Sequence, residues 1–141
     1  MPRPTSDERP PANAATLFII RLAFVSAVVM FGAATWFVQS QQTQEFTRPN
    51  ETLDWLVIGV WAVAAVGLML LSRRYRAAPR GAERRTLAII GWALGEAAAL
   101  IGGVHYFLTG NPLRYGYGLL IFCISLMLFP IARDEGPRLR R

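Results

Sequence analysis

Four long apolar runs dominate the pattern of hydrophobic and polar positions along this chain. They cover about residues 17–38, 53–72, 86–108 and 113–131. A helix of about 20 apolar residues, rising about 1.5 Å per residue, crosses the roughly 30 Å hydrocarbon core of a bilayer. None of the runs alternates apolar and polar residues as membrane β-barrel strands do. The sequence therefore predicts an all-α fold, a four-transmembrane-helix antiparallel bundle.

The composition agrees with a location in the membrane. Of the 141 residues, 53% are hydrophobic and 17% are charged, whereas a typical soluble domain carries about 25% charged residues. We expect the membrane domain to cover residues 14–132, with no sizeable soluble domain beside it. The proline-rich and charged residues 1–13 are expected to form a disordered cytoplasmic tail, and residues 133–141 a basic cytoplasmic tail.

The positions of the arginines predict the orientation. The net charge is +6, and the arginines crowd the connection between the second and third runs and the segment after the fourth. By the positive-inside rule, this connection and both termini are cytoplasmic. The arginines then act as topology signals and contact anionic membrane lipids, and no nucleic-acid partner is expected. The predicted location is the bacterial cytoplasmic (inner) membrane, with multi-pass topology.

The third run carries a single carboxyl group, Glu96, in the middle of the stretch GWALGEAAALIGG (residues 91–103). On a helical wheel Glu96 lies away from an apolar stripe that we expect to face lipid. The stripe consists of Leu87, Ile90, Leu94, Ala97, Ile101, Val104 and Leu108. Exposing Glu96 to acyl chains would cost about 2.5–3.5 kcal/mol. We therefore expect this carboxyl group inside the bundle or in a subunit interface.

A carboxyl group in such a place needs a hydrogen-bond partner. Desolvation disfavours the charged form, so a protonated acid that donates one hydrogen bond is expected. Counting residues from the cytoplasmic ends places three polar side chains near the depth of Glu96. These candidate partners are Ser26, Trp61 and Ser125.

A second face of the same run consists of small residues. Their spacing is the small-xxx-small pattern, which lets another helix backbone approach closely. We predict helix packing along this face, either within the chain or in a homo-oligomer or larger membrane complex. The residues are Gly91, Gly95, Ala98 and Gly102.

Residues 93–112, ALGEAAALIGGVHYFLTGNP, resemble the carboxylate-bearing helix of rotary ATP synthase subunit c, the proteolipid. The shared features are an A-L-x-E-A motif, a later glycine, a long apolar run and a terminal N-P, all after a basic segment. The resemblance implies that Glu96 is an ion-carrying carboxylate. It is carried by Ala93, Leu94, Glu96, Ala97, Gly102, Asn111 and Pro112.

Other residues with chemical potential are few. The chain has one histidine, His105, and one cysteine, Cys123, so neither haem nor a multi-histidine metal site is expected. His105 leaves the helix on the side opposite Glu96, which argues against a proton relay between them. We predict no catalytic residue, no metal and no cofactor.

Three functions follow as hypotheses. The first is a small polytopic membrane protein without enzymatic activity, acting as a packing or accessory subunit. The second is a proton- or cation-handling membrane protein that uses the buried Glu96. The third is an enzyme that acts on lipids or quinones at the periplasmic face. It would have to recruit His105, Arg114, Tyr106, Tyr115 and Tyr117.

Overall fold

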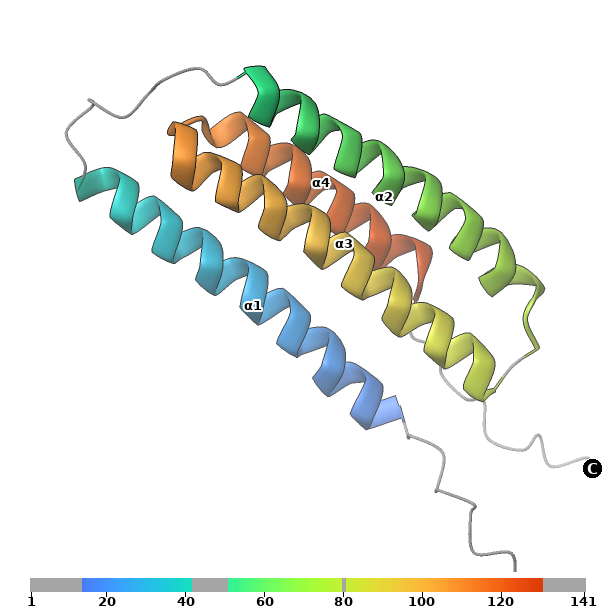
Figure 1. Cartoon of the computed structure of the whole chain (residues 1–141). Coiled ribbons are helices and arrows are strands. Elements are labelled where there is room, and N and C mark those ends of the chain that lie inside the picture. Colours follow the sequence, from blue (N-terminus) through green and yellow to red (C-terminus); the bar gives the residue numbers. More distant parts are fainter. Residues whose placement is uncertain (1–13, 42–50, 80, 131–141) are drawn as a thin grey trace, which may run out of the picture.

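The computed structural model describes residues 14–41, 51–79 and 81–130. This part of the chain is all-α and contains no strand, which confirms that the described residues have the predicted all-α fold (Figure 1). The tails predicted at residues 1–13 and 133–141 lie outside the described residues. The four helices are α1 (Ala14–Gln41), α2 (Glu51–Ala77), α3 (Ala82–Thr109) and α4 (Pro112–Leu128).

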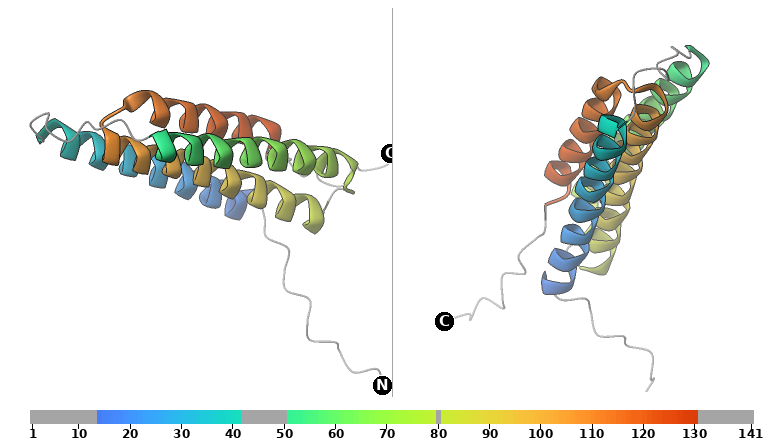
Figure 2. Two further views of the ribbon diagram at one scale, coloured as in Figure 1. Left: turned by 45° about the horizontal axis from the view of Figure 1, so that its top comes forward. Right: turned by 90° about the vertical axis from the view of Figure 1, so that its left-hand side faces the viewer.

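The helix α3 is the centre of the arrangement. It packs against α1, α2 and α4, and α4 also contacts α2. In Figure 1, α1 and α2 flank α3 on opposite sides, and chain direction alternates from each helix to the next. The two other views show α4 displaced to one side of this group (Figure 2). Three sides of α3 are therefore in contact with other helices of the chain, and one side is left uncovered by the described helices.

Three helices, α1, α2 and α3, are long and apolar enough to cross a membrane. The helix α4 has 17 residues and ends at Leu128, before the predicted limit of the fourth run. Its end has a steric cause, because Phe129 precedes Pro130 and adopts φ −120° and ψ 70°. A residue before proline is pushed out of the helical region. Of the four predicted membrane helices, the described residues thus show three long apolar helices and one shorter apolar helix.

The turn between α3 and α4 follows the sequence prediction. Gly110 ends α3 with a φ of 71°, a left-handed conformation that glycine adopts without steric cost. The side chain of Asn111 accepts a hydrogen bond from the Leu113 N–H, and Pro112 is the first residue of α4. Proline is tolerated there because its missing N–H would have no helical partner. This tight turn forces α3 and α4 into an antiparallel hairpin.

Small residues set the distance between α3 and α4. A Cβ atom added to Gly95 would overlap the side chain of Ser125, and one added to Gly102 would overlap the carbonyl oxygen of Arg114. The small-residue face of α3 is therefore filled by α4 of the same chain. The residues in contact with α4 are Gly91, Gly95, Ala98 and Gly102.

The stripe of α3 expected to face lipid is only partly exposed. Leu94 and Ile101 pack against a buried cluster that includes Val57 and Trp61 of α2. The expectation was wrong for these two residues, because α2 covers this side of α3. Other members of the stripe are exposed, namely Ile90, Ala97, Val104 and Leu108. Large exposed apolar side chains occur on all four helices, as at Met30 of α1, which is 70% exposed, and Leu108 of α3, which is 52% exposed.

Candidate functional site

Glu96 lies at the middle of α3, at the edge of the contact between α3 and α1. About two turns further along α3, Gly103 is buried against Phe31 of α1. On the adjoining side, Ala93 and Ala97 are exposed. Glu96 itself is half-buried. Its position on the helix therefore places it between the α1 contact and the side of α3 that the described helices leave uncovered.

None of the three candidate partners forms a hydrogen bond with Glu96. The indole Nε1 of Trp61 donates a hydrogen bond of 3.0 Å to the Ala98 carbonyl. The hydroxyl of Ser125 donates to a carbonyl one turn earlier in its own helix, at 2.7 Å, and Ser26 is exposed on α1. Trp61 and Ser125 thus approach α3 from α2 and α4, on sides away from Glu96. Within the described residues, no group forms a hydrogen bond or ion pair with the Glu96 carboxyl.

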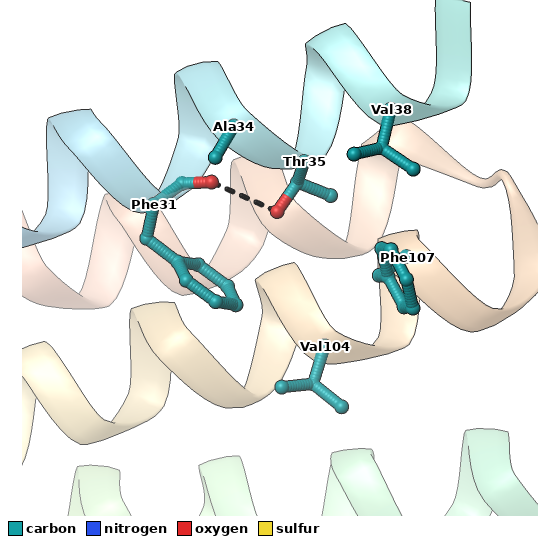
Figure 3. A pocket seen from close by; sticks show the side chains of 6 residues that line it. All are labelled: Phe31, Ala34, Thr35, Val38, Val104 and Phe107. Atoms are coloured by element: carbon teal, nitrogen blue, oxygen red, sulfur yellow. Dashed lines mark hydrogen bonds between the residues drawn. The ribbon is translucent and has the colours of Figure 1, made fainter. Parts of the chain in front are cut away.

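An apolar hollow of about 290 Å³ lies between α1 and α3, towards the Gly110 turn (Figure 3). The hydroxyl of Thr35 donates a hydrogen bond of 2.8 Å to the Phe31 carbonyl, so it is satisfied within its own helix. Phe107 follows Glu96 by about three helical turns on the same face of α3. The hollow and the carboxyl group therefore lie on the same side of α3, separated by about two to three helical turns. The lining residues of the hollow are Phe31, Ala34, Thr35, Val38, Val104 and Phe107.

A polar cluster joins three helices at the end of the bundle near the Gly110 turn. The Nε2 atom of His105 on α3 lies 2.8 Å from Oδ1 of Asp54 on α2. An Nη atom of Arg114 on α4 lies 3.2 Å from the same carboxylate oxygen. The side chain of His105 is 2% exposed, and that of Asp54 is 35% exposed. This cluster links α2, α3 and α4 through one carboxylate.

The imidazole of His105 is fully engaged. Besides the Asp54 contact, its Nδ1 atom lies 3.2 Å from the hydroxyl of Thr109. With both ring nitrogens occupied, the imidazole presents no free nitrogen to a substrate in this arrangement. It also faces away from Glu96, in line with the expected absence of a relay between the two residues. Among the described residues there is no group of three or more His, Cys, Asp or Glu side chains able to hold a metal ion.

Asp54 was not identified as a site residue from the sequence. The sequence feature that could have indicated Asp54 is its carboxylate in the first turn of the second helix, at the same end of the bundle as His105 and Arg114. Depth alone did not show that the three side chains meet, because the neighbours of each helix were unknown.

Side chains from the three other helices converge on the C-terminal end of α4. The last four carbonyl groups of a helix have no partner within the helix, and they are costly to bury unpaired. Here one of them, the carbonyl of Leu126, and the two carbonyls that follow the helix accept hydrogen bonds from side chains. The three bonds run from Arg21 to the Leu126 carbonyl at 3.3 Å, from Trp92 to the Phe129 carbonyl at 3.0 Å, and from Tyr75 to the Pro130 carbonyl at 2.7 Å.

Two guanidinium groups reinforce this end. The guanidinium carbon of Arg21 lies 5.8 Å from the centroid of the Trp92 ring, and that of Arg84 lies 4.4 Å from the centroid of the Tyr75 ring. Cations over aromatic faces are attracted by the ring quadrupole. The positive charge of Arg21 also suits the partial negative charge at the C-terminus of α4. The arrangement explains how a short helix is held inside the bundle.

Comparison with protein-family models, with curated proteins and with solved structures finds no match to this chain. The class of the protein therefore comes from the chain itself. Three helices of sufficient length and apolar character indicate a helical membrane protein.

Proposed function

We propose that this protein is a non-enzymatic packing or accessory subunit of an assembly in the bacterial inner membrane. We place the arginine-rich connection and both termini in the cytoplasm, on the basis of the positive-inside rule. The proposal draws support from the polar side chains of the bundle. Those of Trp61, Trp92 and Tyr75 donate to main-chain carbonyls of neighbouring segments. These three side chains connect helices and do not line the hollow between α1 and α3, whereas catalysis requires polar groups that converge on a pocket.

The single observation that carries the proposal is the state of Glu96. Its carboxyl group is half-buried, lies at the middle of a membrane-length helix, and has no partner within the described residues. Contact with acyl chains would cost this group about 2.5–3.5 kcal/mol. A neighbouring subunit that covers the open side of α3 would remove that cost and supply a hydrogen-bond partner.

Native-gel migration of mild detergent extracts tests the accessory role. The wild-type chain is expected to run in a complex larger than the single chain. Glu96→Gln is expected to preserve that complex, because an amide keeps both donor and acceptor groups. Glu96→Leu is expected to release the chain, because leucine has neither. A wild-type chain that migrates alone, or a complex indifferent to Glu96→Leu, contradicts the proposal.

The alternative is a proton- or cation-handling protein that uses Glu96. The same observation favours it, because no hydrogen bond within the described residues holds the carboxyl group, and the half-buried side chain is partly accessible. Reconstituted vesicles separate the two functions when proton and sodium fluxes are measured for wild type, Glu96→Gln and protein-free controls. The accessory role predicts equal fluxes in all three. A flux present in the wild type and absent in the folded Glu96→Gln variant supports ion handling and contradicts our proposal.

A further inference from the structure

The side of α3 opposite α4 is a surface that the described helices leave uncovered. Ala93, Ala97 and Val104 are exposed there, and Leu100 is half-buried. In the right-hand view of Figure 2, α4 lies to the left of α3, on the side opposite this surface. Because Ala93 and Ala97 carry short side chains, a second helix can approach the α3 backbone closely at the depth of Glu96.

Glu96 indicates what covers this surface. A protonated carboxyl group carries one donor and one acceptor, so the same group on a second molecule complements it completely. Two such groups form a reciprocal pair of hydrogen bonds without any other side chain. The Glu96 carboxyl group needs such a partner, because no other described residue donates a hydrogen bond to it or accepts one from it.

Symmetry brings the two carboxyl groups together. Copies of a membrane protein inserted with the same orientation are related by an axis along the membrane normal, so residue 96 lies at the same depth in each copy. In a two-fold interface the same surface patch is used by both subunits. Residues near the axis then contact their own counterparts. A second copy thus supplies a hydrogen-bond donor and acceptor to Glu96 at the same depth in the membrane.

We propose that two copies of this chain dock through the open side of α3, with the two Glu96 carboxyl groups forming a reciprocal hydrogen-bonded pair. This inference deepens the proposed function and rests on it, since it identifies the neighbouring subunit as a second copy. The exposed residues Ala93 and Ala97 form the close contact between the two α3 helices. The adjoining apolar hollow between α1 and α3 gives room for side chains of the partner copy.

The dissociation constant of the dimer is measured by diluting fluorescently labelled protein in lipid vesicles. Stepwise photobleaching counts the subunits in each complex. The wild type is expected to dimerise, and Glu96→Gln to retain the dimer. Glu96→Leu and Ala97→Leu are each expected to raise the dissociation constant about tenfold or more, the first by removing the hydrogen bonds and the second by separating the helices. Ala23→Leu is the matched control, because Ala23 is exposed on the side of α1 that points away from α3.

Helical content and migration of each variant are checked first, so that a folding defect is recognised. If Ala97→Leu fails to fold, Glu96→Leu against Glu96→Gln still decides the question. A wild type that stays monomeric over the whole dilution range overturns the dimer, as does an equal effect of Ala97→Leu and Ala23→Leu. The accessory role fails separately, when native complexes larger than the chain are absent or unaffected by Glu96→Leu.

Discussion

The indole Nε1 of Trp92 donates a hydrogen bond of 3.0 Å to the carbonyl of Phe129, the residue that ends α4. Both side chains are fully buried. The bond pairs a carbonyl that lies past the last helical residue of α4, and it joins the two helices of the α3–α4 hairpin at the end opposite the turn. The hairpin is therefore closed at the Gly110 turn by backbone geometry and at the other end by a side chain.

Replacing Trp92 with phenylalanine tests this closure. The variant keeps an aromatic ring but leaves the Phe129 carbonyl without its donor, and an unpaired buried group costs about 1–3 kcal/mol. We expect the free energy of unfolding, measured by denaturant titration in detergent micelles, to fall by that amount. Trp55→Phe serves as control, because Trp55 is 72% exposed. Equal losses in the two variants would show that the Trp92 hydrogen bond contributes nothing specific.

Glycine at position 95 permits the close approach of α3 and α4. A methyl group there would overlap the Ser125 side chain and crowd the backbone of Phe122. We expect Gly95→Ala to lower the free energy of unfolding by about 1–3 kcal/mol through overpacking. Gly59 has nothing within 4 Å of the same added atom, so Gly59→Ala is expected to be neutral or stabilising by up to about 1 kcal/mol. If Gly59→Ala lowered the free energy of unfolding more than Gly95→Ala does, close packing at Gly95 would be refuted.

The carboxylate of Asp54 connects α2 to His105 and Arg114. We expect Asp54→Ala to lower the unfolding free energy by about 1–2 kcal/mol, because the buried imidazole nitrogen loses its partner. Glu51→Ala removes an exposed carboxylate one turn earlier on the same helix and should change stability by less than about 0.5 kcal/mol. Thermal unfolding of both variants in the same detergent compares them. Indistinguishable midpoints would mean that the cluster does not hold the helices together.

Arg21 combines a hydrogen bond to the Leu126 carbonyl with a position over the Trp92 ring. Arg21→Met keeps much of the apolar stem and removes the charge. We expect it to destabilise the bundle by about 1–2 kcal/mol, through loss of the favourable charge at the end of α4 and of the cation–π contact. Arg73→Met removes an exposed arginine at the same end of the bundle, which controls for the loss of a topology signal. If unfolding curves of the two variants coincide, Arg21 acts only as a surface charge.

Much of the fold was predictable from residue patterns. Apolar length identified the three long helices, and the sequence Thr109 to Pro112 identified the hairpin, because glycine and proline have few alternatives at such positions. The end of α4 was placed too late because the apolar run continues past Phe129. The local steric effect of Pro130 on Phe129 decides the end instead.

The contacts of the candidate site were harder to predict. The depth of a side chain in the membrane follows from counting residues. Which residues the side chain contacts depends also on which helices are neighbours, and counting does not give this. Ser125 has a depth close to that of Glu96, yet it lies against Gly95 on the side of α4. In the same way, Asp54 and His105 come from segments whose pairing depends on α3 being central. Residue patterns in a single sequence do not specify that arrangement.

The depth and exposure of the α3 surface beside Glu96 test the account most directly. A nitroxide attached at Ala97→Cys, in a chain with Cys123→Ser, is compared for collisions with oxygen and with a water-soluble nickel chelate at high dilution in bilayers. Oxygen concentrates in the bilayer centre and the chelate in water. We predict frequent collisions with oxygen and few with nickel, as expected at mid-depth. Strong nickel access at this position would place Glu96 near the headgroups or in water, and would contradict the membrane-buried surface on which the proposals depend.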